Sequence, residues 1–134
     1  MKYIFSITLL SAVFVSGCFY GYTPLVEVTK INPAVQYPPK DSVAVFWEDG
    51  ATFQKNYQQI AFIEVQGDAY ADKSALLPLL IKEAAKAGAD AVINVKHSYV
   101  TRYSGEALTS IVSGQDNSHE YIATALTGVA VKFN

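Results

Sequence analysis

Two histidines, His97 and His119, are the only imidazoles in the chain and its first candidates for acid–base or metal chemistry. A zinc site needs three or four protein ligands, so both would have to meet a carboxylate, for which Glu106 and Glu120 are the candidates on neighbouring strands. Packing or surface roles are the simpler interpretation of both imidazoles. We therefore keep His97 and His119 as a candidate site and assign no catalytic residue, metal or cofactor.

The sequence contains few motifs for other common chemistries. The chain has no G-x-S-x-G nucleophile elbow, and its isolated glycines, such as Gly105 and Gly114, form no phosphate-binding loop. A net charge of −2 argues against nucleic-acid binding. With one cysteine the chain can form neither an internal disulfide nor a CxxC redox pair. We expect a protein that is not an enzyme and binds no nucleic acid.

The single cysteine, Cys18, carries the clearest chemical signal. It follows a positive N-terminal residue, Lys2, and a run of 13 uncharged, largely apolar residues from Tyr3 to Val15. That run suits the apolar region of a secretory signal peptide and is short of the roughly 20 residues that a membrane-spanning helix needs. We predict that residues 1–17 are a signal peptide.

The residues Val15-Ser16-Gly17-Cys18 resemble the lipobox of bacterial lipoproteins, although Val15 stands where leucine is commonest. The resemblance implies cleavage between Gly17 and Cys18 and attachment of a diacylglycerol to the Cys18 sulfur. Two or more acyl chains give durable membrane anchoring. Phe19 in place of an aspartate implies the outer rather than the inner membrane. An ordinary signal peptide with an incidental cysteine is the alternative.

Residues 18–41 hold four of the five prolines of the chain. Proline removes backbone donors and favours extended conformations, so we interpret this segment as the lipidated N-terminus and a proline-rich tether. Residues Leu25–Ile31 alternate apolar and polar side chains, and a short edge strand there is the less favoured alternative. The tether would lead to a single domain over residues 42–134, because a chain of 134 residues suffices for about one domain.

Residues 42–134 contain five segments rich in β-branched and aromatic residues and bounded by turn residues. Apolar residues fall on both alternations of the second segment, which indicates a β-bulge. In the third segment, one alternation carries apolar residues together with His97 and Tyr99, which places both on the buried face. The predicted strands are Ser42–Trp47, Gln58–Gln66, Ala91–Tyr103, Glu106–Ser113 and Tyr121–Phe133.

A single helix is predicted over Ala75–Ala87, with an apolar stripe along one side. Asp72 or Ser74 can cap its start, Pro78 must lie in the first turn or cause a bend, and Gly88 suits the left-handed residue that ends a helix. The predicted order is β-β-α-β-β-β. We expect an α+β fold: a mostly antiparallel sheet of about five strands with one helix packed on one face.

The helix-to-strand junction at residues 82–93 (KEAAKAGADAVI) resembles that of small YbjQ-like and RcsF-like domains, as does the Gly128-Val129-Ala130-Val131 segment near the end. Residues Tyr37-Pro38-Pro39 resemble a segment that precedes this helix in many small bacterial lipoproteins. The resemblance implies an α+β domain. RcsF-like sensors carry disulfides in this domain, and no cysteine follows Cys18 here, which weakens a stress-sensor role. Two distant histidines give a heavy-metal role no support.

These observations predict a lipid-anchored, non-catalytic protein of the cell envelope. We expect it to attach to the membrane through its lipid and to bind another envelope protein or associate with itself. The serine- and threonine-rich stretch Thr101–Ser118 is the candidate interaction segment. The alternatives are an envelope enzyme or small-ligand or metal binder that uses a pocket near His97 and His119, and an RcsF-like sensor.

Overall fold

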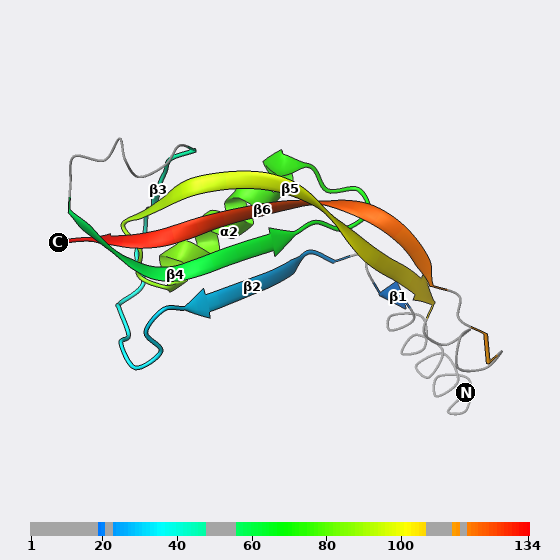
Figure 1. Cartoon of the computed structure of the whole chain (residues 1–134), viewed down its shortest axis with the longest axis horizontal. Helices are drawn as coiled ribbons and strands as arrows, with labels where there is room; N and C mark the ends of the chain where they lie inside the picture. Colours follow the sequence, from blue (N-terminus) through cyan, green and yellow to red (C-terminus); the bar gives the residue numbers. More distant parts are fainter. Residues whose placement is uncertain (1–18, 21–22, 48–55, 107–113, 116–117) are drawn as a thin grey trace, which may run out of the picture.

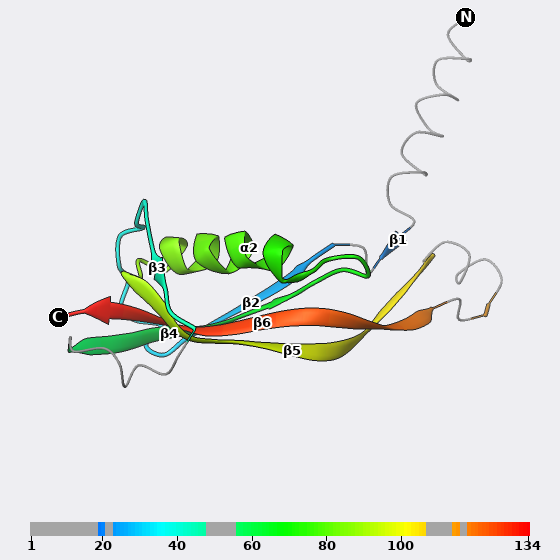
Figure 2. The ribbon, with the colours of Figure 1, turned by 90° about the horizontal axis from the view of Figure 1, so that it is seen from above.

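The computed structural model describes residues 19–20, 23–47, 56–106, 114–115 and 118–134. In this part of the chain, one helix lies on one face of an elongated, mostly antiparallel sheet (Figures 1 and 2). The strands run in the spatial order β1-β5-β6-β4-β2, and β3 pairs with β5. The α+β class predicted from the sequence is confirmed. The elements are β1 (Phe19–Tyr20), β2 (Leu25–Lys30), β3 (Ala44–Val45), β4 (Tyr57–Gln66), α2 (Lys73–Lys86), β5 (Ala91–Glu106) and β6 (His119–Phe133).

The proline-rich segment contributes a strand to the sheet. All six residues of β2 pair antiparallel with β4, from Leu25 opposite Gln66 to Lys30 opposite Ala61. The preference for a spacer is therefore wrong for Leu25–Lys30, and the edge-strand alternative is correct. The alternation of Val26 and Val28 with Glu27 and Thr29 suits a strand with two different faces, and β4 supplies the backbone partners.

The first strand predicted in the domain, Ser42–Trp47, is reduced to the two residues of β3. It runs parallel to β5, with Ala44 opposite Ala91, and the Phe46 N–H donates to the Val92 carbonyl over 2.9 Å. This short strand covers the outer edge of β5 only at its beginning. The predicted strand Glu106–Ser113 begins with the last residue of β5, and residues 107–113 lie outside the described residues.

The helix begins and ends at the residues that its sequence signals indicate. Asp72 is the N-cap, and its Oδ1 accepts a hydrogen bond from the Ala75 N–H over 3.1 Å. Gly88 follows the C-cap with a φ of 81°, in the left-handed region. Pro78 lies in the second turn, because the helix begins at Lys73, and there it removes the N–H that would donate to the Ser74 carbonyl.

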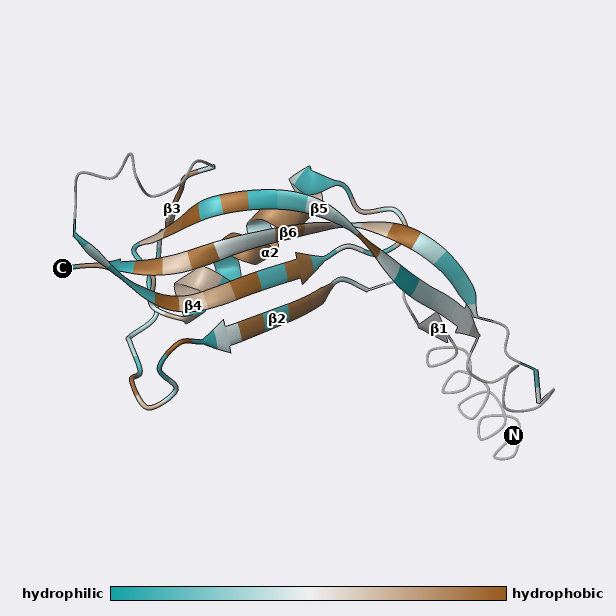
Figure 3. Cartoon of the chain, in the orientation of Figure 1, coloured by the Kyte–Doolittle hydropathy of each residue, from teal (hydrophilic) through white to brown (hydrophobic). Residues whose placement is uncertain are grey.

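The main core lies between α2 and the sheet. Leu76, Leu80 and Ala84 of the helix are fully buried against residues of β4 and β6 such as Val65 and Leu126. A second, smaller cluster comprises Ala91, Ile93, Val129 and Val131, and the side chains of Tyr57 and Phe133 pack against it. Figure 3 shows apolar and polar residues alternating along the strands.

Two β-bulges change which face the side chains occupy. The pairing of β4 with β6 shifts between Gln59 and Ala61, which confirms the bulge predicted in this strand. The pairing of β5 with β6 shifts between Ile93 and Lys96, and Asn94 adopts a φ of 54°. Ile93 belongs to the smaller cluster, whereas Val95, two positions on, belongs to the main core. The extra residue therefore reverses the alternation along β5.

The prediction that His97 and Tyr99 are buried is wrong, because both side chains are exposed. His97 lies opposite Leu126, on the face that carries the helix. However, α2 lies mainly over β4 and β6, and β3 pairs with only Ala91 and Val92 of β5. The side chain of His97 is therefore on the helix-bearing face but lies beyond the part of that face that the helix covers, and it is exposed to solvent.

Candidate functional site

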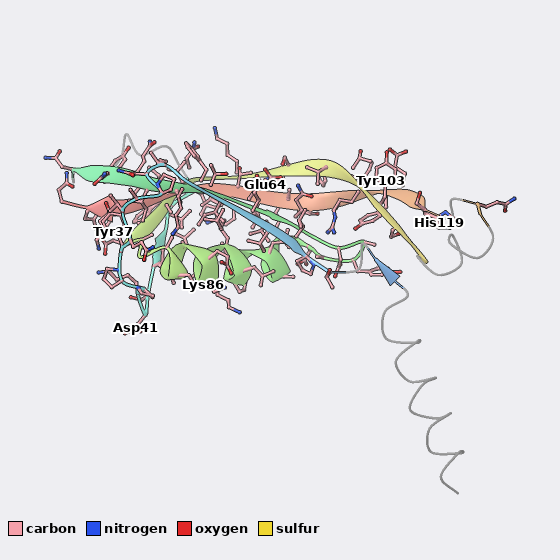
Figure 4. All side chains as sticks on the ribbon, turned by 90° about the horizontal axis from the view of Figure 1, so that it is seen from below. Tyr37, Asp41, Glu64, Lys86, Tyr103 and His119 are labelled. Atoms are coloured by element: carbon pink, nitrogen blue, oxygen red, sulfur yellow. The ribbon has the colours of Figure 1, made fainter. Side chains whose placement is uncertain are left out.

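The structure does not bring His97 and His119 together. His97 makes an edge-to-face contact with the ring of Tyr99, with centroids 6.1 Å apart. His119 lies opposite Ser104, at the other end of the long β5–β6 pair (Figure 4). Ser104 is seven residues beyond His97 along β5, which corresponds to about 23 Å at roughly 3.3 Å per residue. The two imidazoles therefore cannot share one ligand.

The Glu120 carboxylate completes no site with either histidine. Glu120 lies opposite Tyr103 and accepts a hydrogen bond from the Tyr103 hydroxyl over 3.4 Å. Because it directly follows His119 in β6, its side chain points to the face opposite that of His119. Its partner Tyr103 is six residues beyond His97 along β5, which corresponds to about 20 Å at roughly 3.3 Å per residue, so Glu120 is also too far from His97. The side chain of Glu106 lies outside the described residues, as do Gly17 and Cys18. Among the described residues, no three His, Cys, Asp or Glu side chains gather as metal ligands.

A shallow groove of about 330 Å³ lies on the face of the sheet opposite α2. Its face follows from the register: Val65 and Leu126 point toward the helix, so their neighbours Glu64 and Thr127 point away from it. Glu27, Glu64, Thr127 and Lys96 form one row across four strands, each directly opposite the next. The groove is lined by Glu27, Thr29, Phe62, Ile63, Glu64, Asn94, Lys96, Thr127, Gly128 and Val129.

The groove offers hydrogen-bonding and ionic groups beside an exposed ring. Glu64 accepts a hydrogen bond from Gln66 Nε2 over 2.8 Å, and the ring of Phe62 is half exposed. The Oδ1 atom of Asn94, on the bulge, is buried and has no hydrogen-bond partner among the described residues. Two carboxylates, one ammonium group and a free amide oxygen can bind a polar ligand, but they include no nucleophile activated by a base.

This groove was not among the sites predicted from the sequence, although part of the signal is present there. Glu27 alternates with Val26 and Val28, so a strand there would place it on the polar face. The proline content of residues 18–41 favoured a spacer for this segment, and the pairing of β2 with β4 cannot be read from a single sequence. Lys96 reaches the same row as Glu64 only because the bulge at Asn94 reverses the alternation.

Asp90 is the most strongly connected charged group of the described structure, and its contacts are structural. Its carboxylate lies 2.9 Å from Lys40 Nζ and 3.1 Å from Lys132 Nζ, and it accepts a hydrogen bond from the Phe133 N–H over 2.9 Å. The hydrogen bond from Lys40 contributes most to lowering the pKa of Asp90 to about 2. Asp90 thus ties the segment before β3 to the end of β6.

Comparison with known proteins found no matching family model, no matching curated protein and no matching solved structure. The likeness of residues 82–93 to YbjQ-like and RcsF-like domains stays a prediction from the sequence. In the described part of the chain, no helix has the length and apolar character needed to cross a membrane.

Proposed function

We propose that this chain is a lipid-anchored protein of the bacterial cell envelope, held on the periplasmic face of the outer membrane through Cys18, and that it acts as a non-catalytic binding module. The observation that carries the proposal is the position of the cysteine. It directly follows Ser16 and Gly17 at the end of a 13-residue uncharged run, where a signal peptidase needs small residues.

The position of β2 supports a short connection between the anchor and the domain. Leu25 begins the strand, seven residues after Cys18, so a fully extended chain would span at most about 25 Å between them. Thr23 is already held, because its carbonyl accepts a hydrogen bond from Arg102 Nη1 over 3.0 Å. A lipid on Cys18 would therefore keep the sheet close to the bilayer rather than on a long tether.

The described surface supports binding rather than catalysis. The two histidines are far apart, the groove joins polar groups to the exposed ring of Phe62, and the edge of the sheet carries exposed apolar side chains along β2. Mixed surfaces of this kind are typical of recognition sites. Tyr99 and Tyr103 add exposed aromatic side chains on β5.

The test of the anchor is metabolic labelling of the full chain with a palmitate analogue, followed by membrane fractionation and mass spectrometry. The wild type should incorporate the label, should fractionate with membranes and should lack residues 1–17. The Cys18→Ala variant should lose the label and the processing, because it has no sulfur to acylate. Ser11→Ala, within the uncharged run but outside the motif, is the matched control and should behave as the wild type.

An unlabelled wild type, or a Cys18→Ala variant that is cleaved and retained in membranes as efficiently as the wild type, would overturn the lipoprotein proposal. Separation of inner and outer membranes then tests the destination, since the absence of aspartate at position 19 implies the outer membrane. Recovery in the inner membrane would contradict that part of the proposal alone.

A further inference from the structure

Among the described residues, strand β2 forms an open edge of the sheet. It is the last strand in the order β1-β5-β6-β4-β2, and Figure 1 shows no described element beyond it. Its apolar side chains are unusually exposed: Leu25 by 51%, Val26 and Val28 by 37% each, and the following Ile31 by 46%. An exposed apolar edge strand is a template for pairing with another strand.

The direction of the backbone groups of β2 follows from one hydrogen bond. The Ile31 N–H donates to the Ile60 carbonyl of β4 over 3.0 Å, so the backbone groups of Ile31 point toward β4. Backbone groups alternate sides along a strand, and the other odd-numbered residues therefore also point inward. Val26, Val28 and Lys30 consequently turn their N–H and carbonyl groups outward, away from β4.

The opposite side of the sheet is better protected against pairing. There β5 is flanked by β3 at Ala91 and Val92 and by β1 at Gly105 and Glu106. The stretch between them starts at the bulge around Asn94 and carries Lys96 and Arg102. Bulges and charged side chains are the usual devices that prevent edge pairing. By contrast, β2 has no proline or bulge within its six residues, and its two charged residues are Glu27 and, at the end, Lys30.

We propose that β2 pairs with β2 of a second copy of this chain, antiparallel about a two-fold axis at Val28, to form one continuous sheet. This proposal rests on the edge of the sheet and does not depend on lipid anchoring. In this register Val28 lies opposite Val28 of the second copy, Val26 opposite Lys30, Glu27 opposite Thr29 and Leu25 opposite Ile31. The pairing satisfies the outward groups of Val26, Val28 and Lys30 and covers the exposed apolar side chains.

The alternation of backbone groups restricts the register. Outward-facing residues must lie opposite outward-facing residues, so a symmetric pairing can be centred only on a single residue. Centring on Glu27 places two carboxylates directly opposite each other, which is destabilising. Centring on Thr29 places Glu27 opposite Ile31 and leaves Leu25 opposite Pro33. Centring on Val28 avoids like-charge pairs. It places Leu25 of each copy opposite Ile31 of the other, once at each end of the pairing.

The pairing would also join the two grooves. Glu27 and Thr29 line the groove on the face opposite α2, and in the proposed register Glu27 of one copy lies opposite Thr29 of the other. The two-fold axis of an antiparallel pair is perpendicular to the sheet, so both helices would lie on one face and both grooves on the other. The dimer would therefore present one polar surface that crosses the interface.

Cysteine crosslinking of the purified full chain in detergent tests the register. In Val28→Cys the two introduced cysteines should lie about 5.5 Å apart between Cα atoms, within the range of a disulfide. In Thr29→Cys they should lie diagonally, about 7 to 8 Å apart, and crosslink poorly. Combining Glu27→Cys with Thr29→Cys should restore an efficient crosslink. The wild type shows whether Cys18 itself forms a crosslink. Circular dichroism of the reduced variants shows whether they are folded.

The apparent mass in detergent provides the second measurement. Wild type should sediment as a dimer, and Val28→Lys should sediment as a monomer because it places two ammonium groups opposite each other. Ile122→Lys, at a side chain 74% exposed on β6, is the matched control and should remain dimeric. A monomeric wild type, or equal crosslinking of Val28→Cys and Thr29→Cys, would overturn the proposal.

Discussion

Asp90 shows how a single side chain can connect distant parts of this chain. It comes directly before β5, yet it pairs with Lys40 ahead of β3 and with Lys132 at the end of β6. Along the sequence, Lys40 and Lys132 are separated by nearly the whole domain. Because both lysines and the Phe133 N–H favour the ionised carboxylate, they hold the pKa of Asp90 near 2, below the ordinary value of 3.8.

The lowered pKa predicts a pH-dependent loss of stability. Since the folded-state pKa lies below the unfolded one, the contribution of Asp90 is full above about pH 4 and is lost as the pH falls toward 2. After allowance for solvent screening at Lys40, Asp90→Asn should lower the free energy of unfolding by about 1 kcal/mol at pH 7. Urea unfolding at pH 7, 4 and 2.5 measures this difference in the free energy of unfolding between the wild type and Asp90→Asn.

The difference between wild type and Asp90→Asn should shrink across that pH series. Asp41→Asn removes an exposed carboxylate next to Lys40 in the chain and serves as the control. At each pH it should have the same free energy of unfolding as the wild type. A gap between wild type and Asp90→Asn that persists undiminished at pH 2.5 would contradict the assignment.

At the scale of elements, the sequence signals that end α2 also bring the proline-rich segment against it. Gly88 ends the helix with a positive φ, and a side chain there would have its Cβ 2.5 Å from Tyr37 Cβ and 2.7 Å from the Pro38 carbonyl oxygen. The segment is thus packed on the helix end. Glycine is required at position 88 both for its conformation and for this close approach.

Comparison of alanine substitutions at Gly88 and Gly114 should separate these two requirements. Gly88→Ala should destabilise the fold by about 2 to 3 kcal/mol, because a clash with Tyr37 and Pro38 adds to the left-handed strain. Gly114 also has a positive φ, of 66°, but a Cβ there would meet nothing within 4 Å. Gly114→Ala should therefore cost only about 1 kcal/mol. Equal losses in chemical denaturation would mean that the contact with Tyr37 and Pro38 contributes nothing.

At the scale of the whole molecule, one helix covers one face of a sheet that extends well beyond it (Figure 2). The core is concentrated where α2 crosses β4 and β6, and Leu80 is fully buried there near Gly128. The distal half of the β5–β6 pair carries exposed side chains such as Tyr99, Tyr103 and Ile122. Stability and recognition are therefore expected to reside in different parts of the same sheet.

Substitution at the two ends of the sheet tests this division. Leu80→Ala should lower the free energy of unfolding by about 2 to 5 kcal/mol, because it removes buried methyl groups and leaves a cavity between helix and sheet. Ile122→Ala should change it by less than about 0.5 kcal/mol. Thermal unfolding followed by circular dichroism measures both. A comparable loss at Ile122 would show that the distal strands belong to the stabilising core.

The sequence by itself determined the elements whose signals are local. The N-cap at Asp72, the stripe of Leu76 and Leu80 and the positive φ at Gly88 each depend on neighbouring residues, so the helix and the α+β class could be predicted. The segments rich in β-branched and aromatic residues likewise predicted β4, β5 and β6. The motif around Cys18 is also local, and it predicts lipidation.

Only the tertiary structure decided which strands are neighbours and which face each side chain occupies. The pairing of β2 with β4, the separation of His97 from His119 and the row from Glu27 to Lys96 all depend on register. Register is set by contacts between residues far apart in the chain, and one bulge at Asn94 reverses every later side chain of β5. The candidate binding surface could therefore not be derived from the sequence alone.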